Sequence, residues 1–153
     1  MTEPPAAPVD RELLLAAVEL SRRCPPSRTA YAVGSLVVAA DGTELARGHS
    51  RETGPDDHAE EVALARLAAA GLTAAGGTVY SSLEPCGTRR SRPVPCAELI
   101  LAAGIARVVF ALREPPLLAP GGGAALLAAG GVEVVEVADL AGAVREVNRH
   151  LIG

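Results

Sequence analysis

His58, Glu60, Cys86 and Cys96 constrain this chain more than any other feature, because their side chains have the chemistry of a single metal site. Imidazole and thiolate groups bind zinc, and a catalytic zinc has three protein ligands and one open tetrahedral position. His58, Cys86 and Cys96 would supply the three ligands, whereas Glu60 is close to His58 and would remain free to move protons. The segments that carry these residues must therefore converge at one point of the fold.

The metal site has one competing interpretation, which is a coincidence of one histidine and two buried cysteines, since free cysteine is often a small core residue. The chain contains only three His and three Cys, and three of these six residues occur in the required order beside Glu60. This order favours a Zn²⁺ site, and a bound zinc lowers the pKa of a water molecule toward neutrality. We therefore predict Glu60 as the catalytic general acid and base.

Composition limits the class of protein. A length of 153 residues fits one domain, and 49% hydrophobic residues with 2% aromatic residues predict a core of Ala, Val and Leu. The net charge of −4 argues against a nucleic-acid partner. No apolar run is long enough to span a bilayer, and the Pro-rich start is not a signal peptide. We expect an extended or disordered tail over residues 1–9, one domain over residues 10–153, and no membrane partner.

Hydrophobic patterning and turn residues predict alternating strands and helices after an opening hairpin. Asp10 is the expected N-cap of the first helix, and Asp41-Gly42 is the expected hairpin turn. This order predicts a mixed five-stranded sheet covered by helices on both faces. The expected helices cover residues 10–23, 58–70, 95–103, 122–129 and 139–151, and the expected strands cover residues 32–39, 43–48, 78–82, 107–111 and 132–137.

Three further features have less specific interpretations. Glu61 follows Glu60 directly and points elsewhere on a helix, so we expect a capping or solvated residue and not a second base. Cys24 has no partner motif and is interpreted as structural. The glycine run at residues 121–123 lacks the lysine and the spacing of phosphate-binding loops, which favours a flexible loop. The two zinc-ligand cysteines require a reducing compartment to stay thiolates, which predicts a cytoplasmic location.

Residues 13–151 resemble the deaminase domain of bacterial riboflavin-biosynthesis proteins, within the cytidine deaminase-like superfamily. The His-Ala-Glu and Glu-Pro-Cys motifs are typical of the whole superfamily, whereas the long cysteine spacing and the Glu-x-Asn-Arg signature are similar to this branch. The segments that carry the resemblance are residues 33–38 (VGSLVV), 58–64 (HAEEVAL), 82–86 (SLEPC), 92–105 (RPVPCAELILAAGI) and 146–149 (EVNR).

The resemblance implies a three-layer α/β/α sandwich that performs zinc-dependent hydrolytic deamination of a small aminopyrimidine. It also implies a homodimer or homotetramer. The chain ends at Gly153, without the reductase domain of the family, so we expect a stand-alone deaminase. Two alternatives remain open: a deaminase of cytidine-type nucleosides or of a specialised-metabolite aminopyrimidine, and a non-catalytic protein that zinc stabilises.

Departures from the family concern the substrate pocket. Ala30 occupies the position of a family asparagine that is expected to hold substrate, and the two cysteines are one residue further apart than is usual. The arginines between the two cysteines predict either a phosphate clamp or a solvated loop. We predict substrate contacts for Ser82 and for Arg89, Arg90 and Arg92, of which Arg92 matches an arginine of the family.

Overall fold

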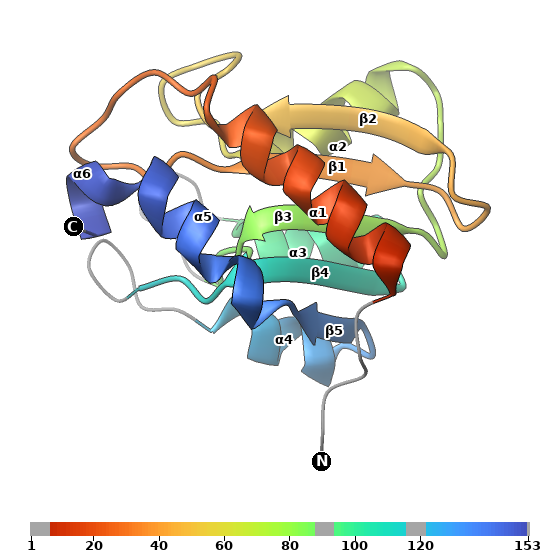
Figure 1. Ribbon diagram of the computed structural model, residues 1–153. Coiled ribbons are helices and arrows are strands. Elements are labelled where there is room, and N and C mark those ends of the chain that lie inside the picture. Colours follow the sequence, from red (N-terminus) through yellow and green to blue (C-terminus); the bar gives the residue numbers. More distant parts are fainter. Residues whose placement is uncertain (1–6, 88–93, 116–121, 153) are drawn as a thin grey trace.

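Five strands form one mixed sheet in the order β2-β1-β3-β4-β5 (Figure 1). The computed structural model describes residues 7–87, 94–115 and 122–152, and the architecture refers to these residues. β1 pairs antiparallel with β2 and β3, whereas β3, β4 and β5 run parallel. The strands are β1 (Gly34–Val38), β2 (Glu44–His49), β3 (Thr78–Leu83), β4 (Arg107–Leu112) and β5 (Glu133–Glu136).

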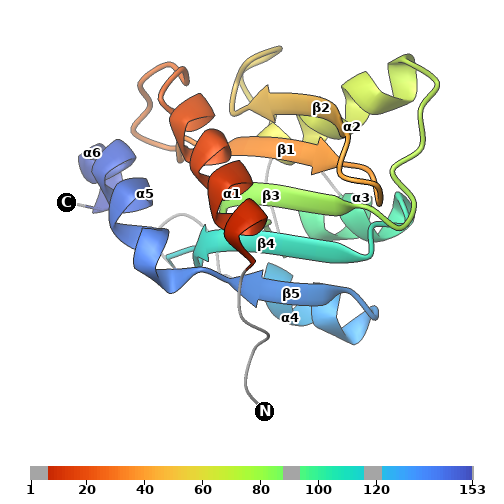
Figure 2. The same ribbon diagram turned by 45° about the vertical axis from the view of Figure 1, so that its right-hand side comes forward.

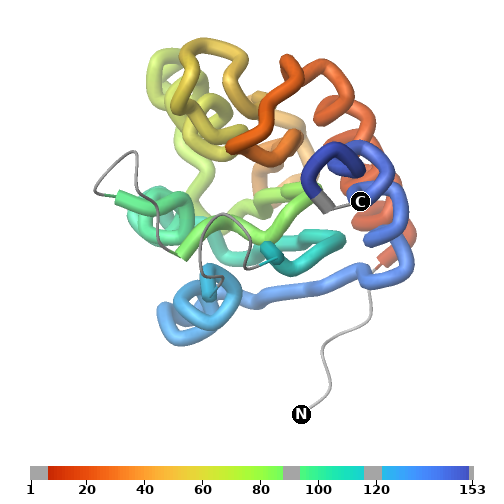
Figure 3. The backbone as a smooth tube through the Cα atoms, turned by 90° about the vertical axis from the view of Figure 1, so that its left-hand side faces the viewer, coloured from red at the N-terminus to blue at the C-terminus, as the bar shows by residue number. Residues whose placement is uncertain are grey.

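Helices cover both faces of the sheet, as the sequence predicts (Figures 2 and 3). One face carries α1 (Pro8–Ser21) and α5 (Ala141–Val147). The opposite face carries α2 (Ala59–Ala69), α3 (Cys96–Ala102) and α4 (Gly123–Ala129). The three-layer α/β/α sandwich is therefore confirmed. Within the described residues, no helix is long and apolar enough to cross a membrane.

Each face of the sheet has its own hydrophobic core. Successive residues of a strand point to opposite faces, so Leu36 and Tyr80 pack under α1, whereas Val37 and Val79 pack under α2. The central strands are buried on both faces and are nearly continuous in Val and Leu, as is usual where helices cover a sheet on both sides. Phe110 is the single phenylalanine of the chain and is fully buried.

The predicted N-cap of the first helix is wrong. α1 begins at Pro8, whose missing N–H costs nothing in the first turn, and Ala7 is the N-cap. Asp10 lies one turn further on, where its carboxylate accepts a hydrogen bond from the Ala7 N–H at 3.1 Å. The carboxylate also forms a bidentate ion pair with Arg107 and accepts a hydrogen bond from the Tyr80 hydroxyl. Asp10 therefore joins α1 to the sheet.

The single closing helix predicted over residues 139–151 is divided into three parts. A 3-10 turn, η1 (Ala138–Leu140), leads into α5, and α6 (Arg149–Ile152) follows after Asn148. The buried Asn148 amide donates to the carbonyls of Val144 and Ala32, and its oxygen accepts from the Ala32 N–H. Asparagine side chains compete in this way with helical backbone bonds, which explains the interruption.

The flexible loop expected at the glycine run is wrong for Gly122 and Gly123, the two members that the structure describes. Gly122 has a φ of +113° and is the N-cap of α4. Gly123 is buried, and a β-carbon built on it would lie 1.7 Å from the Pro85 carbonyl oxygen. These two glycines therefore allow α4 to begin directly against the segment that carries Cys86.

Candidate metal centre and active site

The three predicted zinc ligands lie together where β3 ends and where α2 and α3 begin. His58 is the N-cap of α2, Cys86 follows the last residue of β3 by three positions, and Cys96 is the first residue of α3. The carboxyl ends of parallel strands commonly hold the ligand sites of α/β folds. The Glu61 carboxylate accepts a hydrogen bond from the His58 N–H at 3.2 Å, which confirms the capping role of Glu61.

The ligand atoms are arranged as a tetrahedral metal requires. His58 Nδ1 lies 3.3 Å from Cys96 Sγ and 3.6 Å from Cys86 Sγ, and all three ligand atoms lie within 4.8 Å of one another. Zinc bond lengths of about 2.1 Å to nitrogen and about 2.3 Å to sulfur place tetrahedral ligands about 3.5 Å apart. The distances and the donor set therefore fit Zn²⁺.

The chain itself stabilises a thiolate at Cys86. The Cys96 side chain hydrogen-bonds the Cys86 sulfur, as do His58 and the Cys96 backbone N–H, and together they lower the pKa of Cys86 to about 4. A thiolate is the form of cysteine that binds metal. Among the described residues, no further His, Cys, Asp or Glu joins the group, which leaves the fourth position open as in catalytic zinc sites.

Glu60 lies in the first turn of α2 and is 4% exposed. Burial raises the pKa of this carboxyl group; the charge of His58 and a hydrogen bond with Ser81 act in the opposite direction. A general acid and base works best when its pKa lies near the operating pH, and burial shifts the pKa of Glu60 upward, in that direction. Its environment therefore supports the role that the sequence predicts.

Ser81, and not Ser82, is the serine of β3 that contacts Glu60. Ser81 shares its side of the sheet with Val79, under α2, and its hydroxyl hydrogen-bonds Ser35 Oγ at 3.2 Å. Ser82 points to the α1 side, where its Oγ accepts a hydrogen bond from the Gly34 N–H. The sheet thus separates Ser82 from Glu60, and the substrate contact of Ser82 stays a prediction.

Two glutamates that the sequence analysis missed also belong to this region. Glu84 is buried, and its carboxylate accepts hydrogen bonds at 2.9 Å from the N–H groups of Glu114 and Ala124. The Glu-Pro-Cys motif could have identified Glu84, because Glu84 stands two residues before Cys86, a predicted zinc ligand. No sequence pattern distinguishes Glu114, which follows β4 and reaches the site only through the fold.

Glu114 brings an unusual carboxyl group close to the metal centre. Burial is the largest cause that raises its pKa, and together with the nearby negative charges of Cys86, Glu60 and Glu84 it brings the value to about 8. Its Oε2 atom is the buried side-chain oxygen or nitrogen without a hydrogen-bond partner among the described residues. Such atoms are rare and costly, and they often mark a place where a ligand or water binds.

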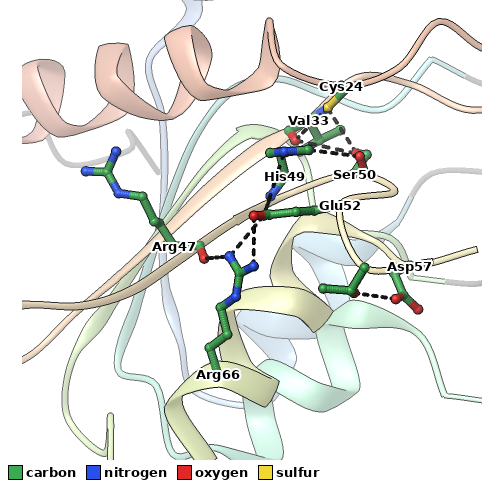
Figure 4. Close-up of polar contacts among 9 residues, drawn as sticks. Cys24, Val33, Arg47, His49, Ser50, Glu52, Asp57 and Arg66 are labelled. Atoms are coloured by element: carbon green, nitrogen blue, oxygen red, sulfur yellow. Dashed lines mark hydrogen bonds and ion pairs between the residues drawn. The ribbon is translucent and has the colours of Figure 1, made fainter. Parts of the chain in front are cut away.

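Cys24 does not belong to the group of predicted zinc ligands, in agreement with its structural interpretation. Its half-buried thiol hydrogen-bonds the Val33 carbonyl at 3.5 Å, and burial raises its pKa. Figure 4 shows the carboxylate of Glu52 between His49 and Arg66, which joins the end of β2 to α2. The predicted contacts of Arg89, Arg90 and Arg92 lie outside the described residues.

Residues 8–112 match the family model of the cytidine and deoxycytidylate deaminase zinc-binding region. The chain belongs to this family. The match includes His58, Glu60, Cys86 and Cys96, which confirms the resemblance to deaminases and the expectation of Zn²⁺ as the cofactor.

Proteins of the riboflavin pathway are among the relatives of this deaminase-family chain. A diaminohydroxyphosphoribosylamino-pyrimidine deaminase of Schizosaccharomyces pombe is 33% identical over 127 residues, which are 82% of this chain and 31% of that protein. The riboflavin biosynthesis protein RibD of Aquifex aeolicus is 40% identical over 102 residues, which are 67% of this chain and 27% of that protein.

A solved structure supports the same relationship. The deaminase/reductase of Thermotoga maritima superposes with a TM-score of 0.77 at 30% identity, over 90% of this chain and 38% of that protein. The chain thus spans about a third of the length of these relatives.

Proposed function

We propose that this chain is a zinc-dependent hydrolytic deaminase of an aminopyrimidine. In this reaction, a ring C–NH₂ group and water give a ring C=O group and ammonia. The observation that carries the proposal is the combination of an open three-ligand centre with a buried carboxyl group, Glu60, beside it. A zinc that only stabilises a fold is closed by four protein ligands and requires no proton carrier.

Proton transfer is the task of Glu60. When bound, zinc lowers the pKa of a water molecule so that a nucleophile is available near neutral pH. Glu60 takes a proton from this water and delivers it to the ring nitrogen, which makes the adjacent carbon electrophilic. Once the water oxygen has added to that carbon, Glu60 takes the second proton of the water from the new hydroxyl group and passes it to the amino group, which leaves as ammonia while the carbon becomes C=O. The Ser81 hydrogen bond supports this role because it limits the orientations of the Glu60 carboxyl group.

The substrate that we propose is a phosphorylated aminopyrimidine riboside, of the kind named for the S. pombe relative. Arg89, Arg90 and Arg92 support a phosphate on the substrate, because guanidinium groups bind phosphate oxygens in a bidentate manner. The second candidate is a cytidine-type nucleoside, and the description of the matching family model favours it.

Three further properties belong to the proposal. We expect the residues from 10 to 153 to form one domain, and we expect a homodimer or homotetramer, because the helix surfaces are rich in Ala and Leu. A monomer at micromolar concentration in light scattering would contradict the assembly. A reducing location such as the cytoplasm suits two thiolate ligands.

An ammonia-release assay on zinc-loaded protein tests the function. The substrates are matched pairs of aminopyrimidine ribosides and cytidine nucleosides, each with and without a 5′-phosphate. We expect the phosphorylated aminopyrimidine to have the highest kcat/KM and Arg92→Ala to remove most of the advantage of the phosphate. Equal kcat/KM values for the two members of each pair would exclude the clamp, and release from cytidine alone would favour the second candidate.

A further inference from the structure

One side chain, Tyr31, joins the segment before β1 to the segment after β4. Tyr31 is 7% exposed, and its hydroxyl donates a hydrogen bond to the Pro115 carbonyl at 3.2 Å. The two residues are 84 positions apart in the sequence. Glu114 directly precedes Pro115, and its negative charge raises the pKa of Tyr31 further than burial alone does. Tyr31 and Glu114 are therefore close neighbours.

The backbone around Tyr31 is itself fixed. Asn148 binds both backbone groups of Ala32: its oxygen accepts from the Ala32 N–H at 2.7 Å, and its amide donates to the Ala32 carbonyl at 3.0 Å. Arg51 donates to the Tyr31 carbonyl at 3.4 Å. A tyrosine held in this way on a buried backbone loses little entropy when its hydroxyl forms a hydrogen bond.

Hydrogen bonds fix the backbone on both sides of Glu114 but do not fix its carboxyl group. Its N–H donates to Glu84 at 2.9 Å, and Tyr31 holds the carbonyl of the next residue. Yet Glu114 Oε2 is buried without a hydrogen-bond partner among the described residues, within electrostatic reach of Glu60 and Cys86. The backbone of this segment is therefore fixed, while the Glu114 Oε2 atom near the metal centre has no hydrogen-bond partner among the described residues. This combination is typical of a group that is preorganised for a ligand.

We propose that Tyr31 is a positioning residue whose hydroxyl fixes the Glu114–Pro115 segment, so that the Glu114 carboxyl group meets an amino group of the bound pyrimidine beside Glu60. The inference rests on the proposed function and adds a specificity determinant to it. The N–H groups of an aminopyrimidine can donate hydrogen bonds to a buried carboxyl oxygen. Because Tyr31 acts only through Glu114, its hydroxyl controls the binding of substrate and not the proton transfers of Glu60.

Kinetics of Tyr31→Phe test the inference, because this change removes only the hydroxyl. A hydrogen bond between neutral groups corresponds to about a threefold to tenfold change in an equilibrium. We therefore expect KM to rise about threefold to tenfold, with kcat changed less than twofold. We expect KM to rise in Glu114→Gln as well. The double variant Tyr31→Phe/Glu114→Gln should have the same KM as Glu114→Gln alone, because the effects of two coupled residues do not add.

Tyr80→Phe is the matched control, because Tyr80 is an equally buried tyrosine whose hydroxyl bonds Asp10 on the α1 side of the sheet. It should lower stability and leave KM unchanged. The inference is overturned if Tyr31→Phe leaves KM unchanged, or raises it by the same factor with and without Glu114→Gln.

Amide hydrogen exchange of the zinc-loaded protein supplies a readout that does not depend on turnover. The Glu114 N–H, which Glu84 binds, should exchange at least about threefold faster in Tyr31→Phe and at the unchanged rate in Tyr80→Phe. An unchanged Glu114 rate in Tyr31→Phe overturns the positioning role even if the wild-type protein is an active deaminase. Conversely, a wild-type protein that releases no ammonia from any substrate overturns the proposed function, whatever the exchange rates are.

Discussion

The backbone N–H of Cys96 donates a hydrogen bond to the sulfur of Cys86 at 3.2 Å. A second backbone bond, from the Ala97 N–H to the Cys86 carbonyl at 3.0 Å, fixes the start of α3 against the same residue. Nine residues separate the two cysteines, and closing a loop of this length costs little more than closing a shorter one. The long spacing is therefore compatible with two ligands to one metal, because backbone bonds within the site bring the second cysteine into place.

We predict about one zinc per chain, held by His58, Cys86 and Cys96. Cys96→Ala should lose most of the metal after dialysis against a mild chelator, because only two of the three protein ligands remain. Cys24→Ala is the matched control and should retain the full amount, since Cys24 lies outside the ligand group. Metal analysis by mass spectrometry checks both variants, and full retention by Cys96→Ala would exclude Cys96 as a ligand.

Glu60→Gln should keep zinc and lose activity. Glutamine preserves the size of the side chain but cannot carry a proton between water, the ring nitrogen and the leaving group. The rate of ammonia release should fall by roughly 10²–10⁴-fold, the usual contribution of a positioned acid–base group. Steady-state kinetics measure the rate of ammonia release, and metal analysis of the same sample measures the zinc content. Near-normal turnover of the zinc-loaded variant would falsify the role of Glu60.

The grouping of His58, Cys86 and Cys96 and the order of the elements were predictable from the sequence, whereas the surroundings of the site were not. His58-Ala59-Glu60 and Pro85-Cys86 are local motifs, and local chemistry identifies them without a fold. Ser81 and Ser82 are adjacent, and only the side of β3 that faces α2 decides which of them contacts Glu60. Sequence reasoning does not determine that side, because β3 is buried on both faces and each face carries one serine.

Long-range contacts explain the remaining differences. Aspartate is a residue type that is favoured at N-caps, which explains the prediction for Asp10. Its ion-pair partner Arg107 is 97 residues away, and the pair stabilises a helix that starts earlier, at Pro8. Asn148 divides the last helix because its amide binds Ala32, 116 residues away. Glu114 shows no local signal at all, since burial near Cys86 and Glu60 arises only when β3, β4 and α2 pack together.

Asp10→Asn should destabilise the protein in a pH-dependent way. The hydrogen bonds with Arg107 are the largest cause that lowers the pKa of Asp10, from 3.8 to about 2. A carboxyl group with a lowered pKa stabilises the fold above its unfolded pKa, and this contribution disappears as the pH falls through the folded value. The variant should lose on the order of 2 kcal/mol at pH 7, and the difference from wild type should shrink between pH 4 and pH 2.

Urea unfolding of both proteins at each pH measures this difference, and any metal loss in acid affects both proteins alike. Asp139→Asn is the control, because the ion pair of Asp139 with Arg11 is largely exposed to solvent. Exposed pairs contribute about 0–1 kcal/mol, so this variant should resemble wild type at every pH. A constant difference between Asp10→Asn and wild type from pH 7 to pH 2 would contradict the ion-pair origin of the effect.

Gly123→Ala should damage the metal centre although Gly123 is not a ligand. The added methyl group would lie 1.7 Å from the Pro85 carbonyl oxygen, and backbone atoms of the Cys86 segment cannot give way as a flexible side chain can. We expect a loss of stability above about 2 kcal/mol, because overpacking against rigid backbone is costly. We also expect weaker zinc retention, since any shift of Pro85 moves Cys86.

Gly142→Ala is the matched control for this substitution. Gly142 lies in α5, and a β-carbon added there meets nothing within 4 Å. Replacing a helical glycine by alanine at an unstrained position stabilises a protein by about 0.4–1 kcal/mol, so this variant should unfold at a higher temperature. Thermal unfolding with and without chelator measures both effects. If Gly123→Ala keeps wild-type zinc affinity, the close contact of α4 with the Cys86 segment does not position the ligand.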